Sequence, residues 1–545
     1  MNKLTERRIL LAAAAVFLVW SAGFITRSSF VAVDGNRYFC LGDDAMISMR
    51  YAANLVSGHG PVWNPDERVE GYTNFLMVLV MAAKIAVLGK TGALLGVQIF
   101  GAAGILVTAW LARSVADEVF RDFPEQDRIP ARTLGALCVL CYYPLLYWTL
   151  LGMETGLLTV LLTAATLAAV RYAGNANLRD GLLSALLLGL AFLTRPDSGV
   201  FALVGFGGLF LVAVRSRKPA VWRHLFAAGA VYAAFVVGLT VFRYAFYGQP
   251  VPNTYTLKMT GMPIAERLRN GITFMGPFWI ESAPVLLFAA GEVLFDFRRR
   301  KVLPAGLVLG MLAYQVWIGG DMSTYWRIAA PAMPLALVLF AGGAVAWVRS
   351  LSGTEFFRKY VLRNPVFPPV HAVNWVSALV VGLGCLAADC RFAPEVSLMD
   401  RPAGTESNLS NVNISIALQE LTSEDASVGV FWAGTIPYFT GRRGIDFLGK
   451  CDSHIAGLPA DISGDVGFRG MNSVPGHNKY DLHYSIKQRR PTYVQRFKWG
   501  GQDLTDWARD RYVEVTWRGV KLLLLRSSPH VHWDKALPPA PATDQ

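Results

Sequence analysis

Long apolar runs recur through the first 389 residues of the chain and then stop. A run of about 18 uncharged, apolar residues is long enough to cross the hydrocarbon core of a bilayer as a helix. Eleven such runs lie at about 9–26, 93–112, 133–150, 156–172, 181–194, 198–214, 225–242, 272–295, 303–318, 328–348 and 371–389. The pattern therefore predicts an all-α, polytopic membrane body over residues 1–389.

A further apolar run, at residues 73–89, decides which loops share a side of the membrane. If it lies along the outer surface as a juxtamembrane helix, one side collects six segments that carry most of the lysines and arginines of the body. These segments are 1–8, 113–132, 171–180, 214–224, 298–301 and 349–363. Basic loops are retained in the cytoplasm. We therefore predict eleven spanning helices, a cytoplasmic N-terminus and an outer C-terminal region.

Residues 390–545 have a different character. They contain no spanning run, many charges and many turns. Short β-like stretches lie at 428–432, 491–495, 512–517 and 520–525, and Arg518-Gly519 between the last two is typical of a hairpin turn. A segment of about 155 residues suits one small domain. We predict a soluble, extracytoplasmic C-terminal α/β domain at 390–545.

The composition narrows the class of protein. Charged residues make up 17% of the chain, against about 25% in soluble proteins, and 53% are hydrophobic. A disordered chain, a secreted disulfide scaffold and an ordinary cytosolic enzyme are thereby excluded. The net charge of +12 follows from the basic cytoplasmic loops, so no nucleic acid is expected as a partner. One bridge among Cys40, Cys390 and Cys451 stays an open alternative.

Two adjacent carboxylates, Asp43 and Asp44, lie in the first loop predicted to face outward. Such a pair can share a proton, hold a cation or act as a general base. The alternative is that an aspartate caps the free N–H groups of a helix start, which is the commoner role of an isolated pair. The choice depends on what else gathers on the same face.

Other polar residues gather on that face, at the ends of apolar runs. They include His59, Glu70, Tyr72, Glu154, Arg195, Asp197, Asn253, Tyr255, Lys258, Asp321 and Arg327. Carboxylates near membrane depth are costly and mark sites or pathways, while arginine and lysine bind phosphate. Simpler interpretations are an interfacial ion pair for Arg195 with Asp197 and a turn residue for His59. Because all of these polar side chains gather on one face, the pattern favours a site for a sugar phosphate.

The outer loops also carry longer motifs. The first loop reads Asp43-Asp44-Ala45-Met46-Ile47-Ser48-Met49-Arg50-Tyr51-Ala52, then Gly58-His59-Gly60 and Val69-Glu70-Gly71-Tyr72-Thr73-Asn74. Gly152-Met153-Glu154-Thr155-Gly156, Arg195-Pro196-Asp197, Pro252-Asn253-Thr254-Tyr255, Gly319-Gly320-Asp321-Met322, Asp452-Ser453-His454 and Gly476-His477-Asn478 follow in order. These motifs resemble the GT-C membrane glycosyltransferases that use polyprenyl-phosphate sugars, above all the mycobacterial terminal β-(1→2)-arabinofuranosyltransferases and their bacterial relatives.

The resemblance implies a GT-C transmembrane catalytic domain at 1–389 in the bacterial plasma (inner) membrane. It implies transfer of a sugar, D-arabinofuranose, from decaprenyl- or undecaprenyl-phosphate arabinofuranose to a cell-envelope glycan or glycoprotein. The acceptor would lie on the outer face of the lipid bilayer, where the C-terminal domain is periplasmic or otherwise extracytoplasmic.

The resemblance also implies roles for the site residues. Asp43 or Asp44 would be catalytic, deprotonating or orienting the acceptor hydroxyl. The substrate-binding residues would be Arg195, Lys258 and Arg327 for the phosphate, Glu70, Glu154 and Asp321 for sugar hydroxyls, His454 and His477 in the C-terminal domain, and His59, Tyr72, Asp197, Asn253 and Tyr255 as further contacts. A divalent cation is an option beside Asp43 and Asp44, although two carboxylates are too few ligands to imply one.

Two other classes of function remain as alternatives. A transporter or flippase of lipid-linked sugars would be polytopic too, but its coupling sites lie near mid-membrane and within repeated halves. No internal repeat is visible in this sequence. An O-antigen ligase or polymerase would also use a polyprenyl carrier outside, with chemistry expected to depend on arginine and histidine instead of an acidic pair.

Overall fold

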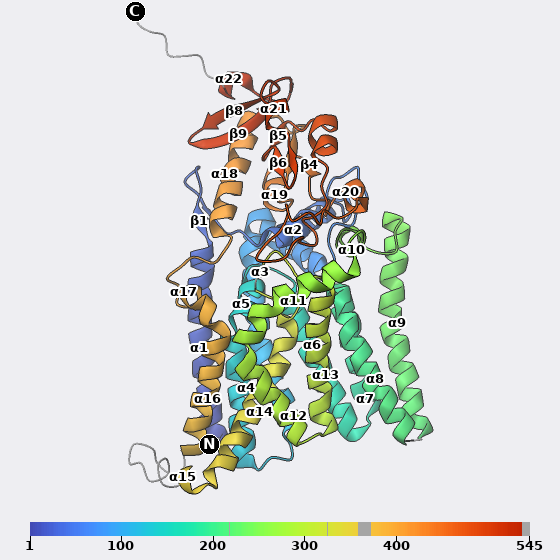
Figure 1. The fold of residues 1–545 in the computed structure, drawn as a ribbon, viewed down its shortest axis with the longest axis vertical. Coiled ribbons are helices and arrows are strands. Elements are labelled where there is room, and N and C mark those ends of the chain that lie inside the picture. The colour runs from blue at the N-terminus through green and yellow to red at the C-terminus, as the bar shows by residue number, and fades with distance from the viewer. Residues whose placement is uncertain (217, 324, 358–371, 537–545) are drawn as a thin grey trace, which may run out of the picture.

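The computed structural model describes residues 1–216, 218–323, 325–357 and 372–536. Long helices stand side by side in the lower part of the molecule, and a small sheet with short helices lies above them (Figure 1). The helices of the body are α1 (Lys3–Ser28), α3 (Phe75–Val119), α4 (Glu125–Cys141), α5 (Tyr143–Leu150), α6 (Thr155–Asn175), α7 (Leu178–Thr194), α8 (Gly199–Ser216), α9 (Pro219–Tyr247), α11 (Ile264–Glu281), α12 (Ala283–Phe295), α13 (Arg299–Trp317), α14 (Met333–Ser352) and α16 (Ala372–Asp389). The eleven predicted apolar runs fall largely within these helices.

Among the described helices, fewer than the predicted eleven are both long and apolar enough to cross a membrane. Within the described ranges, seven helical segments are long and apolar enough to cross a membrane by themselves. The count reaches nine if the bent pairs α4–α5 and α11–α12, with bends of 50° and 82°, are one span each. The prediction of a multi-pass membrane body is thus supported, whereas the count of eleven stays a prediction.

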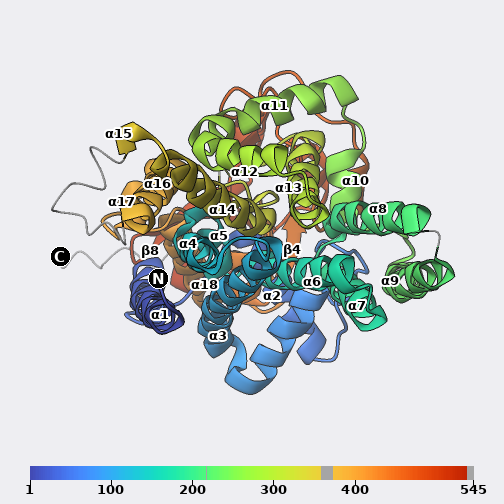
Figure 2. The same cartoon turned by 90° about the horizontal axis from the view of Figure 1, so that it is seen from below.

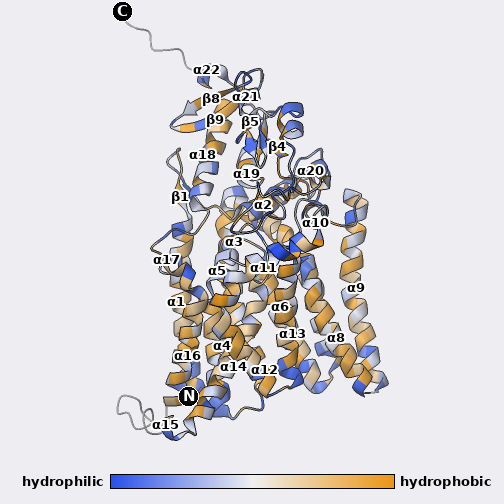
Figure 3. Ribbon diagram, in the orientation of Figure 1, coloured by the Kyte–Doolittle hydropathy of each residue, from blue (hydrophilic) through white to orange (hydrophobic). Residues whose placement is uncertain are grey.

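The ends of the helices divide into two sets. The N-terminus, the short α15 (Glu355–Phe357) and the α12–α13 connection lie at the lower end in Figure 1, while α2 (Asp43–Val56), α10 (Asn253–Met259) and the sheet lie at the upper end. Apolar residues dominate the helices below, and polar ones become frequent above (Figure 3). The described parts of the predicted basic segments therefore share one end, and the predicted site loops share the other. Residues 217 and 358–363 of those segments lie outside the described residues.

Helix α3 changes direction at Gly89, where the backbone takes φ 71° and ψ 171°. A positive φ is strained for residues with a side chain, so glycine suits this break. The part before Gly89 stays near the upper end beside α2, and Figure 2 shows it angled away from the part that follows. This geometry agrees with a juxtamembrane helix over the run 73–89.

The C-terminal region contains a five-stranded sheet in the order β4-β3-β5-β9-β8. Strands β3 (Ser427–Val430), β4 (Arg443–Asp446) and β5 (Tyr493–Val494) are parallel, and β8 (Tyr512–Trp517) and β9 (Val520–Leu525) complete it in antiparallel pairing. The β8–β9 turn has φ 46° at Arg518 and 81° at Gly519, as a type I′ hairpin requires. The four predicted strands and the hairpin turn are confirmed.

Short elements complete the chain. The body has the 3-10 turns η1 (Pro196–Ser198), η2 (Ala330–Ala332) and η4 (Cys390–Phe392), and the helix α17 (Ala393–Val396). The C-terminal region has α18 (Thr405–Leu421), α19 (Thr435–Thr440), α20 (Ser453–Gly457), η5 (His483–Gln488), α21 (Thr505–Ala508) and α22 (Trp533–Ala536). Two-stranded ribbons pair β1 (Phe30–Val31) with β2 (Arg37–Tyr38) and β6 (Lys498–Trp499) with β7 (Gln502–Asp503). All six cysteines are free, so the structure has no bridge among Cys40, Cys390 and Cys451.

Buried Arg50 joins α2 to the C-terminal region. Its guanidinium donates to the carbonyl oxygens of Trp63, Pro437, Gly441 and Arg442 at 3.0–3.2 Å. A buried charge needs such a full set of acceptors, because each missing one leaves an uncompensated donor. This contact fixes the C-terminal region over the start of α2, where the acidic pair lies.

A buried ion pair at the lower end holds the first helix against the body. Glu6 accepts from Arg113 at 2.7 Å and from Arg132 at 2.8 Å, and its side chain is 3% exposed.

We expect Arg132→Met to lower the free energy of unfolding by about 3–5 kcal/mol, since Glu6 loses a buried partner. Thermal unfolding of the detergent-solubilised chain measures this. Exposed Arg121→Met, which removes a surface pair with Glu118, is the control and should change stability by less than about 1 kcal/mol. Equal losses in the two variants would contradict the assignment.

Candidate active site

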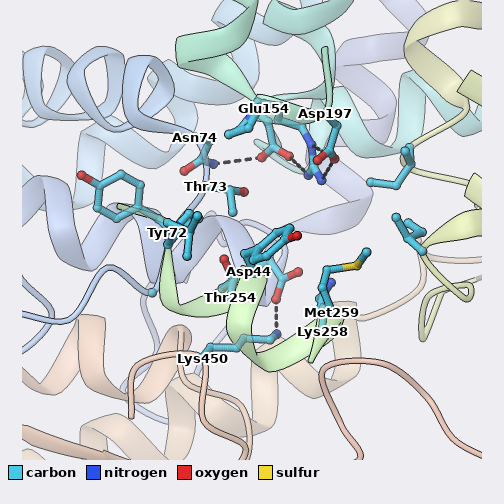
Figure 4. Close-up of a pocket in the computed structure, with 18 of the residues that line it drawn as sticks. Asp44, Tyr72, Thr73, Asn74, Glu154, Asp197, Thr254, Lys258, Met259 and Lys450 are labelled. Carbon is cyan, nitrogen blue, oxygen red and sulfur yellow. Dashed lines mark hydrogen bonds and ion pairs between the residues drawn. The ribbon is translucent and has the colours of Figure 1, made fainter. Parts of the chain in front are cut away.

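A cavity of about 400 Å³ opens at the upper end of the helices, beside α10. We call it the α10 cavity; Figure 4 shows many of its side chains. Residues of the α2 start, the 71–74 segment, the α5–α6 and α7–η1 turns, α10 and the 320–328 loop line it, and Lys450 enters from the C-terminal region. Segments far apart in the sequence thus meet around one space.

Asp44 lies in this cavity between two cations. Its Oδ2 accepts from Arg327 Nη1 at 2.6 Å, and its Oδ1 accepts from Lys450 Nζ. Burial acts to raise the pKa of Asp44, but Lys450, Arg327 and Lys258 outweigh it and hold the pKa well below its usual range. Asp44 is therefore a carboxylate, one third exposed, at neutral pH.

Asp43 points elsewhere. Its two oxygens accept from the backbone N–H groups of Gly434 and Thr435 at 3.2 and 3.1 Å. Only glycine fits at 434, because an added Cβ would lie 2.0 Å from the Asp43 carbonyl oxygen. Burial raises the pKa of Asp43, with Lys450 and the Thr435 N–H offsetting part of the rise. The pKa values of the two adjacent carboxyl groups are therefore shifted in opposite directions. Of the two, only Asp44 lines the α10 cavity.

A second carboxylate cluster forms the far wall of the cavity. Arg195 donates to Glu154 at 2.6 Å and to Asp197 at 3.0 Å, and Glu154 also accepts from Asn74 at 2.9 Å. The hydroxyl of Tyr314 donates to Asp197 at 2.9 Å. Since all three guanidinium nitrogens of Arg195 are bonded to these carboxylates, the geometry assigns Arg195 to holding the wall more than to binding phosphate.

The other cationic side chains near the cavity have fewer hydrogen-bond partners than Arg195. Arg243 pairs with buried Glu70 at 2.8 Å through Nε, and its Nη2 has no partner in the described part of the chain. Arg327 likewise keeps an unpartnered Nε while it pairs with Asp44 and with Asp321 at 3.2 Å. Among the described lining residues, Lys258 is the one cation without a carboxylate oxygen within 4.0 Å. These three side chains can take up an anion.

The predicted site residues divide into three groups. Nine line the α10 cavity: Asp44, Tyr72, Glu154, Arg195, Asp197, Tyr255, Lys258, Asp321 and Arg327. Asp43 and His477 line a neighbouring cavity described below. The other four lie outside both cavities. Glu70 accepts from Arg243, and Asn253 donates to the carbonyl oxygen of Lys450. His59 and His454 are exposed, and the His454 ring lies 4.2 Å from that of Tyr484. The structure therefore gives His59 and His454 no place in either cavity.

Two charged residues of the α10 cavity, Lys450 and Arg243, were missing from the sequence-based prediction. Lys450 stands just before the Asp452-Ser453-His454 motif, but a lone lysine in a domain rich in charges gives no signal. Arg243 follows directly on the apolar run 225–242. A charge at the end of a span is a hint of function, and that signal was available for Arg243.

Asn253 positions Lys450 instead of contacting the cavity. Its amide donates to the carbonyl oxygens of Gly449 at 2.8 Å, Lys450 at 3.0 Å and Asp452 at 3.3 Å. We expect Asn253→Ala to speed amide exchange across residues 446–452 by about tenfold, since each lost hydrogen bond is worth about 1 kcal/mol. Hydrogen–deuterium exchange measured by mass spectrometry tests this. Thr256→Ala on the same helix is the control, and equal exchange in the two variants would contradict the role.

A divalent cation does not fit the acidic pair as it stands. Each of the four carboxylate oxygens of Asp43 and Asp44 already has a partner: Gly434, Thr435, Arg327 or Lys450. Two of these partners are cations, which repel a metal ion. Across the described ranges, no group of three or more His, Cys, Asp or Glu side chains is placed to hold a metal.

The chain is 26% identical over 359 residues to the terminal β-(1→2)-arabinofuranosyltransferase of Mycobacterium tuberculosis, covering 60% of this chain and 51% of that protein. It is 27% identical over 377 residues to the enzyme of the same description from Corynebacterium glutamicum, covering 63% and 49%. The chain is homologous to terminal β-(1→2)-arabinofuranosyltransferases. It spans about half the length of these curated relatives.

Solved structures agree on the fold. ArnT from Cupriavidus metallidurans, bound to undecaprenyl phosphate, matches with a TM-score of 0.50 at 12% identity, over 82% of this chain and 86% of that one. The oligosaccharyltransferase AglB from Archaeoglobus fulgidus, in complex with an inhibitory peptide and a dolichol-phosphate, matches with a TM-score of 0.56 at 12% identity, over 98% and 75%. The GT-C fold that the loop motifs implied is thereby supported. Residues 403–533 match a domain of unknown function (DUF8728).

Proposed function

We propose that this arabinofuranosyltransferase homologue is a membrane glycosyltransferase. It moves D-arabinofuranose from a polyprenyl-phosphate donor to a cell-envelope glycan or glycoprotein on the outer face of the bacterial plasma membrane. The observation that carries the proposal is the setting of Asp44, a carboxylate between two cations in a cavity at the end of a membrane helix bundle. Curated homologues with this activity, and neighbours of the same fold bound to polyprenyl phosphates, support it.

The phosphate of the donor binds to the cations that have free donors. Within the described ranges, Lys258 has no carboxylate oxygen within 4.0 Å, and Arg243 and Arg327 keep buried N–H groups with no described acceptor. An anion satisfies these groups with charge-assisted hydrogen bonds, which are the strongest kind. The carboxylates of Glu154, Asp197 and Asp321 around the same cavity accept hydrogen bonds from sugar hydroxyls.

Asp44 takes the proton of the acceptor hydroxyl. As the phosphate binds, it competes with Asp44 for Arg327, so the pKa of Asp44 rises from its depressed value and the carboxylate becomes a better base. The acceptor oxygen then bonds to the anomeric carbon while the bond from that carbon to the phosphate oxygen breaks. The proton stays on Asp44, and polyprenyl phosphate leaves with the electron pair. No metal ion at the Asp43–Asp44 pair takes part in this mechanism.

The acidity of Asp44 predicts a pH effect. Transfer requires ionised Asp44 and is lost as pH falls through its pKa. We expect Lys450→Met to move the acid limb of the pH profile of kcat/KM to higher pH, because Lys450 is the cation that lowers this pKa most. Initial rates across an acidic pH series measure the limb. Lys521→Met, an exposed residue paired with Glu514 on the distal hairpin, is the control. An acid limb that stays in place in Lys450→Met would contradict Asp44 as the base.

A transfer assay tests the proposed function itself. The purified chain is incubated with radiolabelled decaprenyl-phosphate arabinofuranose and a synthetic arabinofuranoside acceptor, beside the double variant Asp43→Asn, Asp44→Asn. Label should reach the acceptor with wild type and fall to background with the double variant. Transfer that survives in the double variant would overturn the site. Absence of turnover, with movement of the lipid-linked sugar across liposomes instead, would favour the transporter alternative.

A further inference from the structure

A second cavity, of about 290 Å³, lies between α5 and α18, and we call it the α18 cavity. It shares Asp44, Met153, Asp321, Arg327 and Lys450 with the α10 cavity. The two spaces therefore meet at Asp44, the proposed base. A molecule in the α18 cavity reaches this carboxylate without passing Lys258 or Arg243, which line the α10 cavity alone.

The lining of the α18 cavity differs in charge from that of the α10 cavity. Beyond the shared residues and Asp43, its described lining contains no Asp, Glu, Lys or Arg and one histidine, His477. Burial lowers the pKa of His477 to about 3, so this imidazole is neutral at physiological pH. Lys258, Arg195 and Arg243 line the α10 cavity alone. The two cations of the α18 cavity, Arg327 and Lys450, are already paired with carboxylates. This lining therefore suits a neutral, polar molecule better than a second phosphate.

Aromatic rings and hydrogen-bonding groups both line the α18 cavity. The rings are Tyr147 and Trp148 of α5 and the half-buried Trp432. The Trp432 ring is held by contacts with His477 at 5.8 Å and Trp499 at 6.2 Å. Rigid rings of this kind supply contact area at low entropic cost. Apolar faces of sugar rings pack on such surfaces while their hydroxyls point to polar neighbours.

A buried polar atom in this lining lacks a partner. His477 is 6% exposed, and its Nδ1 has no hydrogen-bond partner among the described residues. An unsatisfied buried nitrogen costs about 1–3 kcal/mol, which a ligand hydroxyl would recover. The amide of Asn408 is oriented by its donation to the Leu41 carbonyl at 2.9 Å in the same wall. The cavity therefore has both an aromatic platform and a fixed polar group.

We propose that the α18 cavity is the acceptor site and binds the terminal ring of a neutral glycan between Trp432 and the α5 aromatics. His477 then bonds a hydroxyl of that ring, and the hydroxyl to be glycosylated lies at Asp44. This inference rests on the proposed function. It also gives the domain that matches a family of unknown function a role, since Trp432, Lys450 and His477 all lie within residues 403–533.

The test separates acceptor from donor kinetics in the full chain. The probes are decaprenyl-phosphate arabinofuranose as donor and an octyl arabinofuranosyl disaccharide as acceptor. We expect Trp432→Ala and His477→Phe each to raise the KM for the disaccharide by about tenfold, as loss of a central anchor does, with an unchanged donor KM. Trp517→Ala, a partly buried tryptophan of the distal hairpin, is the matched control. A raised donor KM, or an unchanged acceptor KM, would overturn the proposal.

A binding measurement keeps this inference separate from the catalytic one. Saturation-transfer NMR records contact between the disaccharide and the protein without any donor. Contact in wild type that is lost in Trp432→Ala but kept in Lys258→Met supports the acceptor site even if no transfer reaction is found. Contact that persists in Trp432→Ala, or that is absent in wild type, would overturn it.

Discussion

Asp44→Asn is expected to lower the rate of sugar transfer by about 1,000-fold, the range that loss of a general base produces. Asparagine keeps the shape of the side chain, but it cannot take a proton and cannot balance Arg327 and Lys450. Arg327, freed from the Asp44 carboxylate, would then bind the donor phosphate more tightly. The expected signature is therefore a large fall in kcat with a donor KM that is unchanged or lower, measured with radiolabelled donor at saturating acceptor.

Asp43→Asn is the matched control for this prediction, because it is the neighbouring carboxylate with different contacts. Asp43 accepts from two backbone N–H groups at 434 and 435 and lies outside the α10 cavity. Its asparagine variant keeps one acceptor oxygen, so we expect a loss of about tenfold through weakened attachment of the 434–435 turn. A larger loss in Asp43→Asn than in Asp44→Asn would reverse the assignment of the base.

Lys258→Met is expected to raise the donor KM by about 100-fold with a smaller change in kcat. A hydrogen bond to a charged group is worth about 1.5–3 kcal/mol. No described carboxylate lies within 4.0 Å of Lys258, so its removal leaves no paired carboxylate among them without a partner. Burial lowers the pKa of Lys258, although Asp321 and Asp44 oppose this, so an arriving phosphate also stabilises its charged form. Steady-state kinetics with varied donor concentration measure the effect.

Lys258→Arg keeps the charge and is the control for size and packing. It should retain most of the donor affinity, because guanidinium and ammonium groups both bind phosphate. Equal losses in the Met and Arg variants would mean that Lys258 is needed for its packing on α10, and the phosphate assignment would be wrong. Arg195→Lys gives a further contrast: its ion pairs hold Glu154 and Asp197, so it should impair kcat and KM together.

The sequence by itself determined the class of architecture. A bilayer requires long apolar runs where the chain crosses it and basic segments on its cytoplasmic side. Both features depend on local composition alone, so they can be identified without knowing any tertiary contact. They predicted the helical body, the shared end of the site loops and the break before the second part of α3. Alternation and turn residues likewise predicted β8, β9 and the turn at Arg518-Gly519, since a hairpin depends on neighbours in sequence.

Only the tertiary structure decided which polar residues work together. Asp43 and Asp44 are adjacent in sequence, yet one faces a turn near residue 434 and the other faces Arg327 and Lys450. Lys450 lies 406 positions from Asp44, and no local pattern reports so distant a contact. His59 and His454 lie in motifs like those of the residues that line the α10 cavity, but both side chains are exposed. Motifs mark a region of the chain, whereas side-chain direction and long-range packing determine which residues reach the cavity.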